Sequence, residues 1–420
     1  MDTFATLLPI LDACAAESLL ERKALRMAKI EQIVAPMLED IRRRGDEAVC
    51  EYCRRFDGFD SPSLLVSSAE LEQAASQLAP AFRDAILVAS QNIREYAAEQ
   101  LPRAWMREYS AGRRLGQIVR PLASIGAYIP AGRYPLPSTL LMTVIPAQVA
   151  GVPVICVACP RPSVEILGAA HLLGVTRVFR IGGAQAIGAL AFGTATVPKV
   201  DRIAGPGNIY VAAAKKLVAG ETGIDFAAGP TEIVIIAAEA DPRHLAADLL
   251  AQAEHDIEAS SILLTPSRAL AEATAREIER QIETLPTAAV ARASICTHGA
   301  CLLTHSLEEA VDISNRLAPE HLSLYHPELL PGIQNAGSVF LGPFSPEAAG
   351  DYASGPNHVL PTAGAARLRG GLSAADFVKV ISIQELTAGA LALLAPSITT
   401  LARAEGLEAH ARSVEVRLGL

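Results

Sequence analysis

From residue 138 onward, short apolar runs alternate along the chain with stretches that carry apolar residues at helical spacing. Apolar runs of about four to eight residues are typical of buried strands, and a period near 3.6 predicts amphipathic helices. The first series comprises helix 139–149, strand 152–158, helix 164–173, strand 177–181, helix 184–191 and helix 209–218. Fully apolar strands separated by helices indicate a parallel sheet that is covered on both faces.

A second series of the same kind runs from residue 229 to about residue 371. It comprises strand 233–238, helix 242–254, strand 261–265, helix 269–284, strand 300–304, helix 307–317 and strand 338–341. Helical spacing also covers 24–56, 67–98 and the tail 383–420, whereas residues 1–22 suit a peripheral segment. We therefore predict an α/β fold with two Rossmann-like but incomplete parallel-sheet units and helical N- and C-terminal extensions.

Composition narrows the class of protein without changing this fold. Of the 420 residues, 50% are hydrophobic and 19% are charged, which is typical of a soluble enzyme and excludes disorder. A formal charge of −9, 5% aromatic residues and the lack of a Lys/Arg run argue against a nucleic-acid partner. The chain has no apolar stretch of ~18 residues and no basic start, so we expect no membrane segment, no signal peptide and a cytoplasmic location.

The seven cysteines include two C-x-x-C pairs, Cys50/Cys53 and Cys156/Cys159. The first pair lies in a charged helical stretch and the second along an apolar strand. A structural zinc site needs turn-forming knuckles instead, so we expect these cysteines to be ordinary packed thiols.

Gln252 and His255 lie at the end of the expected helix 242–254. Because they stand three residues apart, both side chains leave the same face about one turn from each other. His255 lies near the end of the periodic run, where a side chain is freer to reach into a cleft.

A second polar cluster occupies residues 350–358 (GDYASGPNH), which show neither helical nor strand periodicity. This glycine-rich stretch carries Asp351 and His358, and a long irregular loop with such side chains is typical of a binding site. Together with His255 and His410 they suit a borderline metal ion, with zinc first. The spacing leaves open which of these side chains converge.

Glu320 and His321 follow the expected helix 307–317 and precede a probable strand. Consecutive side chains point apart, so the pair can provide two separate proton acceptors. A general base with a pKa near neutrality contributes roughly 10²- to 10⁴-fold in rate, and histidine has such a pKa without heavy tuning.

Two glycine-rich turns, 182–183 and 205–208, each precede an expected helix. Backbone N–H groups at the start of a helix bind phosphate, so either turn could hold a nucleotide. Neither contains the G-x-G-x-x-G pattern, and a simple tight turn explains them equally well.

Longer stretches resemble one known family. QAEHD, APEHL, GDYASGPNHVLPT, GGAQAIGALAFGT, AGPGNIYVAAAKKLV and AEGLEAHA are similar to motifs of histidinol dehydrogenase and occur in the same order, from about residue 25 to the C-terminus. The resemblance implies oxidation of L-histidinol through the aldehyde to L-histidine, with two NAD molecules and a bound zinc ion.

The resemblance also implies a role for each matching residue. Four side chains would hold the zinc: Gln252, His255, Asp351 and His410. His410 would come from the partner subunit of an obligate homodimer through a swapped C-terminal tail. His321 would remove the alcohol proton, and Glu320 would activate water at the aldehyde stage. Substrate contacts would come from the zinc ligands, His321, Thr231, His358 and Glu405, and NAD contacts from Tyr128, Gln185 and Asn208.

On the same grounds the chain divides into four parts. Residues 1–22 form a peripheral segment, 23–127 with 230–372 form a first α/β domain that carries the zinc and catalytic residues, 128–229 form a second α/β domain on the NAD side, and 373–420 form the swapped helical tail.

Some positions depart from the family pattern. Thr231 stands where serine is usual, the turn 130–134 reads PAGRY instead of beginning PGG, and Arg369 and Val380 lie in altered motifs. Arg133 and Arg369 leave a sister enzyme as an alternative, with the sulfonated diol 2,3-dihydroxypropanesulfonate as substrate, because guanidinium groups bind oxyanions.

Against that alternative, Gln185, Glu405 and the QAEHD run keep the histidinol pattern, and a carboxylate such as Glu405 repels a sulfonate. A second alternative of another class is a zinc-stabilised binding or regulatory protein without turnover. The presence of both Glu320 and His321 argues against it.

Overall fold

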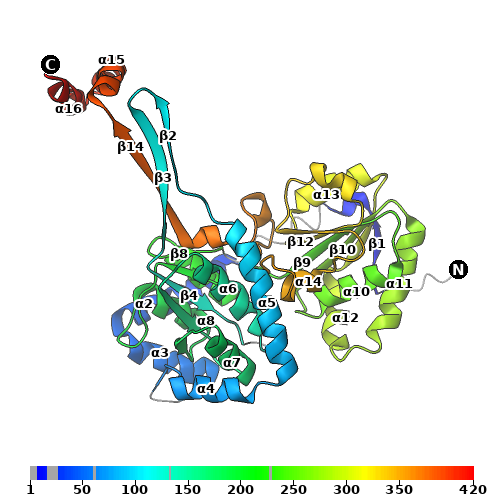
Figure 1. The fold of residues 1–420 in the computed structure, drawn as a ribbon. Helices are drawn as coiled ribbons and strands as arrows, with labels where there is room; N and C mark the ends of the chain where they lie inside the picture. Colours follow the sequence, from blue (N-terminus) through cyan, green and yellow to red (C-terminus); the bar gives the residue numbers. More distant parts are fainter. Residues whose placement is uncertain (1–6, 17–26, 60–62, 132–133, 227–228) are drawn as a thin grey trace.

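The structure, a computed structural model, describes residues 7–16, 27–59, 63–131, 134–226 and 229–420. Two parallel sheets with their covering helices form the body of the molecule, and an arm of three antiparallel strands leads from the body to a pair of C-terminal helices (Figure 1). This mixed α/β architecture with parallel sheets confirms the predicted fold class at that level.

The smaller parallel sheet has the strand order β6-β5-β4-β7-β8. Its strands are β4 (Ser124–Tyr128), β5 (Val154–Ala158), β6 (Arg177–Phe179), β7 (Arg202–Ala204) and β8 (Gly223–Ile224). The helices between them are α6 (Pro137–Val149), α7 (Val164–Leu172), α8 (Gly183–Phe192) and α9 (Ile209–Val218). Numbered along the chain, the order is 3-2-1-4-5, that of a Rossmann sheet, so the direction of winding reverses between β4 and β7.

The larger parallel sheet has the order β1-β11-β10-β9-β12-β13. Its strands are β1 (Ile10–Asp12), β9 (Glu232–Ile236), β10 (Ser260–Thr265), β11 (Ala300–Leu303), β12 (His321–Leu324) and β13 (Ser338–Leu341). Its helices are α10 (Pro242–Ala253), α11 (Arg268–Ile282), α12 (Ala288–His298), α13 (Leu307–Leu317) and α14 (Glu347–Tyr352). Without β1 the order is again 3-2-1-4-5, so the two units repeat one topology. β1 pairs with β11, so residues 10–12 of the expected peripheral segment form an edge strand of this sheet.

Four N-terminal helices pack against α6–α9, the helices that cover the smaller sheet: α2 (Met27–Arg44), α3 (Asp46–Tyr52), α4 (Ser68–Gln77) and α5 (Pro80–Glu99). Ile86 and Ile93 of α5 share a buried core with Ile125 of β4, and Ile41 of α2 shares another with Ile203 of β7. The hydrophobic cores therefore join residues 27–99 to 124–224, whereas the expected division grouped 23–127 with 230–372. Sequence spacing indicated amphipathic helices, but it did not indicate which sheet their apolar faces cover.

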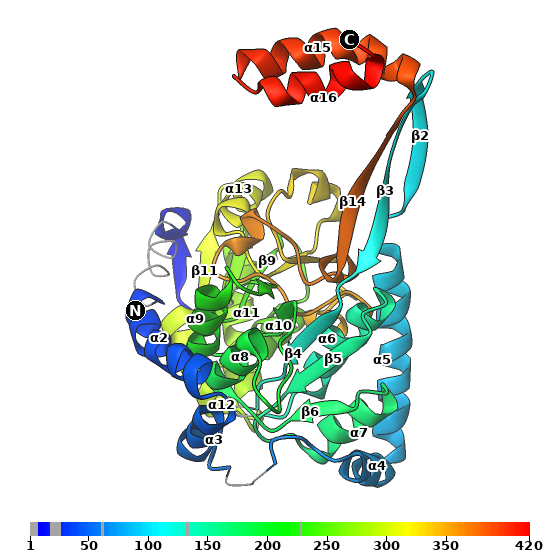
Figure 2. The same ribbon diagram turned by 90° about the vertical axis from the view of Figure 1, so that its left-hand side faces the viewer.

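The arm consists of β2 (Trp105–Ser110), β3 (Arg113–Pro121) and β14 (Val378–Leu386), in the order β14-β3-β2. It carries α15 (Ala388–Ala404) and α16 (Glu408–Leu418) away from both sheets, as two perpendicular views show (Figures 1 and 2). The expected all-helical tail 373–420 is wrong over β14, because VKVISIQEL pairs with β3 along its whole length. β-branched residues such as Val378, Val380 and Ile383 favour that extended conformation.

The remaining general expectations concern the cysteines and the membrane. All seven cysteines are free thiols, and Cys53, Cys156 and Cys159 are buried among apolar side chains, as expected for packed thiols. Within the described residues, no helix combines the length and the apolar character that spanning a bilayer would require.

Candidate active site

Glu320 and His321 lie at the amino-terminal edge of the larger sheet, where β12 begins beside β9. His321 pairs in register with Ile233, so Thr231 and Glu232 at the start of β9 come next to the Glu-His pair. The side chains of Glu320 and His321 are almost wholly buried. The structure thus confirms the expected strand after Glu320 and buries both side chains of the Glu-His pair.

A hydrogen-bond chain connects Glu320 to Gln252 on α10. The hydroxyl of Thr231 donates to Glu320 Oε2 at 2.5 Å and accepts from Gln252 Nε2 at 2.7 Å. The hydroxyl of Thr231 has a single proton, which it donates to the carboxylate of Glu320. It can therefore only accept a hydrogen bond from Gln252, and the donor must be the NH₂ group of the Gln252 amide. This arrangement fixes the orientation of the Gln252 amide. Its Oε1 is buried and has no hydrogen-bond partner in the described parts of the chain.

One ring nitrogen of His321 contacts the backbone, and the other has no hydrogen-bond partner among the described residues. Nδ1 lies 3.3 Å from the backbone oxygen of Glu232, which favours the tautomer with the proton on Nδ1. Nε2 is buried and makes no hydrogen bond to any described residue, and it lies 3.6 Å from Asp351 Oδ1. In this tautomer Nε2 carries the lone pair of the ring, and no described side chain accepts or donates a hydrogen bond there.

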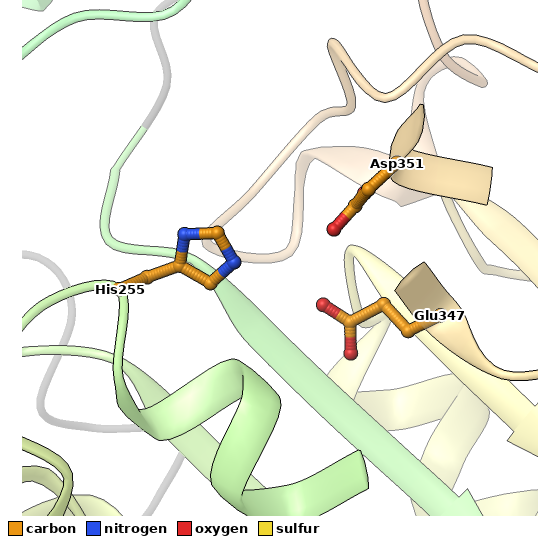
Figure 3. A group of neighbouring side chains, drawn as sticks. All are labelled: His255, Glu347 and Asp351. Atoms are coloured by element: carbon orange, nitrogen blue, oxygen red, sulfur yellow. The ribbon is translucent and has the colours of Figure 1, made fainter. Parts of the chain in front are cut away.

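His255, Glu347 and Asp351 bring one ligand atom each to within 4.8 Å of one another (Figure 3). His255 follows the end of α10, and the two carboxylates come from α14 and point toward the imidazole. Since α14 spans Glu347–Tyr352, the expected irregular loop 350–358 is wrong over its first three residues. The helix begins after Pro346, and the four-residue spacing puts Glu347 and Asp351 on one face.

Glu347 was not anticipated from the sequence. Its side chain is 2% exposed, its Oε1 lies 3.7 Å from His321 Nδ1, and its Oε2 has no hydrogen-bond partner among the residues described. A proline followed by two carboxylates at helical spacing was the available signal. Reading residues 350–358 as a loop concealed that signal.

The electrostatics of this pocket reflect an excess of buried carboxylates. Burial raises the pKa of Glu320 to about 7 and that of Glu347 to about 8. Burial opposes the charged form of His321, but the carboxylates of Glu347 and Glu320 outweigh it and raise the pKa of His321 to about 10. Asp351 is half-buried, which opposes its charged form, yet His321 keeps its pKa below the usual value. Buried carboxylates of this kind are stabilised by a positive charge.

The donors in the pocket fit a divalent metal ion. Gln252 Oε1 and Glu347 Oε2 are buried oxygens without a hydrogen bond to the described residues, and His255 supplies an imidazole beside the carboxylate of Asp351. Mixed nitrogen and oxygen donors of this kind suit zinc and related ions. The chemistry of the donor set is thus compatible with the predicted zinc site on this chain.

His358 occupies a supporting position. Its Nδ1 lies 2.8 Å from the backbone oxygen of Asp351, and its Nε2 lies 3.3 Å from the hydroxyl of Thr139. Burial lowers the pKa of His358 and so favours the neutral ring. Both ring nitrogens therefore contact protein groups, and the ring braces the segment that carries Asp351.

Glu405 and His410 lie far from this pocket within one chain. Glu405 ends α15 and His410 belongs to α16, and both helices lie at the distal end of the arm (Figure 2). Both side chains are exposed. The structure therefore brings together Thr231, Gln252, His255, Glu320, His321 and Asp351, but neither Glu405 nor His410.

The expected NAD contacts lie around the carboxyl edge of the smaller sheet. Tyr128 ends β4, and its hydroxyl accepts a hydrogen bond from Gly183 N at 3.1 Å. Gln185 is buried in the first turn of α8, and its Nε2 donates to Asp57 at 3.0 Å, a partner that the sequence did not suggest. Asn208 caps α9 by accepting from the backbone N–H groups of residues 210 and 211.

Tyr128 ends β4 and Asn208 follows β7, so these two residues flank the point where the sheet reverses its winding. Dinucleotides bind in that crevice in doubly wound sheets.

Of the two arginines that suggested a sulfonate, Arg369 is engaged elsewhere in the fold. Arg369 donates to the backbone oxygen of Asp225 at 2.7 Å and to Asp376 at 2.8 Å, so its guanidinium joins the end of the smaller sheet to the base of the arm. Arg133 lies outside the described residues.

Two Rossmann-like sheets and a buried Glu-His pair beside a cluster of metal-ligand side chains define the class: an α/β oxidoreductase that uses a nucleotide cofactor. The chain belongs to the histidinol dehydrogenase family, whose family model matches residues 20–418. Histidinol dehydrogenase of Geobacter sulfurreducens is 49% identical over 93% of this chain and 94% of its own length, and that of Thermus thermophilus is 50% identical over 92% and 94%.

The crystal structure of histidinol dehydrogenase from Elizabethkingia anophelis has a TM-score of 0.94, with 37% identity over 99% of this chain and 98% of that one. These matches confirm the resemblance and identify the chain as an NAD-dependent oxidoreductase of histidine biosynthesis with the activity of that family. They give no support to a sulfonated diol as the substrate.

Proposed function

We propose that the pocket binds zinc through Gln252, His255, Asp351 and His410 of the partner subunit, and that it oxidises L-histidinol in two steps with NAD. The observation that carries this proposal is the unpartnered pair Gln252 Oε1 and His321 Nε2, which are buried at one site. Thr231 fixes the amide that leaves Oε1 available, and Glu232 fixes the ring that leaves Nε2 available.

When bound, zinc supplies a positive charge that orients the imidazole and amine of the substrate and offsets the carboxylates, while NAD accepts the hydride. In the first oxidation, His321 Nε2 takes the proton of the alcohol as hydride leaves the carbon. In the second, Glu320 takes a proton from water as the water adds to the aldehyde carbon, and the hydrate so formed then loses a hydride to a second NAD to give the carboxylate. A raised pKa suits Glu320 to this role, because a base works best when its pKa is near the working pH.

The proposed cofactor site uses Tyr128, Gln185 and Asn208 at the carboxyl edge of the smaller sheet. Support comes from the Rossmann strand order and from the N-terminus of α9, which follows the glycine-rich turn 205–208. Thr231, His358 and Glu405 complete the proposed substrate contacts. For Thr231 the hydroxyl already bonds to Gln252 and Glu320, so its contribution is mainly to orient these two side chains.

We further propose a homodimer in which the arm places Glu405 and His410 in the pocket of the other subunit. The arm carries both residues away from their own pocket (Figures 1 and 2). Apolar residues on its helices are unusually exposed for a single chain: Leu393 is 80%, Leu401 64% and Val416 75% exposed. Contact with a second subunit would bury such side chains. We also propose that this biosynthetic enzyme is located in the cytoplasm.

The decisive experiment is a substrate comparison with purified, zinc-loaded protein. NADH formation is followed at equal concentrations of L-histidinol and 2,3-dihydroxypropanesulfonate. We expect two NADH per L-histidinol and no turnover of the sulfonate. Turnover of the sulfonate alone would overturn the proposed substrate. Zinc content and subunit mass, measured on the same sample, test the metal and the dimer separately.

A further inference from the structure

Gly205 follows β7 directly and begins the turn 205–208. Its φ of +122° lies in the region that favours glycine, and a Cβ at this position would lie 2.1 Å from the backbone oxygen of Tyr128. The turn therefore packs tightly against the end of β4, at the point where the winding of the sheet reverses. Small shifts of Gly205 would move the residues that follow it, including Asn208.

Both backbone polar groups of Gly205 are held by one buried ion pair. Gly205 N donates to Asp225 Oδ2 at 2.8 Å, and Lys215 Nζ donates to Gly205 O at 2.9 Å. Lys215 Nζ and Asp225 Oδ1 also contact each other directly. Lys215 is 1% exposed and Asp225 5% exposed, so water contributes little to this arrangement.

Burying an ion pair in a protein core carries a large desolvation free energy. Removing two charges from water often costs more than their attraction returns, and well-packed apolar residues are commonly as stable. Core packing therefore does not account for this pair. Its distinguishing feature is geometric: Lys215 comes from α9 and Asp225 from the segment after β8, and together they determine the orientation of the peptide groups on both sides of Gly205.

We propose that Lys215 and Asp225 are positioning residues for NAD. By holding Gly205, they set the path of the turn 205–208, and so place Asn208 and the first N–H groups of α9 against the dinucleotide. Neither side chain touches the cofactor in this proposal, since both are occupied and buried beneath the turn. The inference rests on the proposed NAD site at this turn.

The test replaces the pair without leaving an unpaired charge. In the double variant Lys215→Met/Asp225→Asn, the amide oxygen of the new residue can still accept from Gly205 N, but the donor to Gly205 O is lost. We expect the Kd and KM for NAD to rise about 10-fold or more, because small misplacements of binding groups have effects of this size. The KM for L-histidinol should change less than about twofold.

The matched control is Lys216→Met, one residue further along the same helix. Lys216 is exposed and pairs with Glu31 at the surface, so its loss should leave both KM values unchanged. NAD binding is measured by fluorescence titration of the zinc-loaded dimer, with thermal unfolding recorded for each protein. A folded double variant with the NAD affinity of the parent would overturn the proposal.

If the double variant does not fold, Lys215→Met alone replaces it. This change removes the donor to Gly205 O, while Asp225 keeps the backbone N–H groups of Gly205 and Phe226 as partners. It should weaken NAD binding in the same direction, and an unchanged Kd for NAD would again refute the positioning role.

Two further variants, Tyr128→Phe and Asn208→Asp, separate this inference from the function on which it rests. If they leave NAD binding unchanged, the proposed cofactor site is wrong. If they weaken it while the double variant does not, only the role of Lys215 and Asp225 fails.

Discussion

Replacing Thr231 by valine should show how the structure prepares a metal ligand before the metal arrives. Valine has nearly the shape of threonine but neither donates to Glu320 nor accepts from Gln252, which the hydroxyl does at 2.5 and 2.7 Å. A hydrogen bond to a charged group contributes about 1.5–3 kcal/mol and a neutral one about 1 kcal/mol. The free energy of unfolding of Thr231→Val should therefore fall by about 2.5–4 kcal/mol.

The same substitution should weaken zinc binding. Without the hydroxyl, nothing in the described surroundings distinguishes the two ends of the Gln252 amide, so Oε1 is no longer held toward the ion. Loss of a group that orients a metal ligand typically reduces metal affinity about 10- to 100-fold. Competition between the protein and a zinc chelator of known affinity measures this change, and denaturant unfolding measures the stability.

Thr231→Ser is the matched control, because it keeps the hydroxyl and removes only a methyl group. It should retain zinc within a factor of about three and lose less than about 1 kcal/mol. If valine and serine gave the same zinc affinity as the parent, the hydroxyl would have no part in orienting Gln252, and the reasoning from hydrogen-bond polarity would be refuted.

Three other substitutions test separate parts of the site. His321→Asn should keep zinc but slow the first NADH-forming step roughly 10²- to 10⁴-fold in single-turnover kinetics, and an unchanged rate would exclude His321 as the base. His410→Ala should lose zinc during dialysis faster than the parent, and equal retention would remove His410 from the ligand set. Asn208→Asp keeps the oxygen that caps α9 but loses the amide donor, so the KM for NAD should rise several-fold while the thermal stability changes little. If only the thermal stability fell, Asn208 would be a helix cap and not a cofactor contact.

The parallel-sheet units were predictable because their signals are local. Each buried strand is a short apolar run, and each covering helix repeats apolar residues at 3.6-residue spacing, so β5, α7, β10 and α13 occur close to where the pattern places them. The adjacency of Glu320 and His321, and the three-residue spacing of Gln252 and His255, likewise depend only on nearby positions.

The features that were missed depend on contacts between distant segments. VKVISIQEL forms β14 because it meets β3, some 260 positions earlier in the chain, and helical spacing in the rest of the tail obscured this. The association of α2–α5 with the smaller sheet depends on which face each helix buries. The sequence did not identify Glu347 as part of the pocket, because this depends on α14 beginning after Pro346. It did not identify Asp57 as the partner of Gln185, because these residues are far apart along the chain.

The arm has a genetic consequence. In the proposed dimer, each active centre combines a pocket from one polypeptide with a tail from the other, so a defect in His321 and a defect in His410 can be carried by different chains. A hybrid of these two mutant chains holds one centre with both defects and one centre with neither. Random re-pairing of two inactive homodimers should then restore roughly a quarter of the original activity, which makes the enzyme a candidate for complementation between alleles of a single gene.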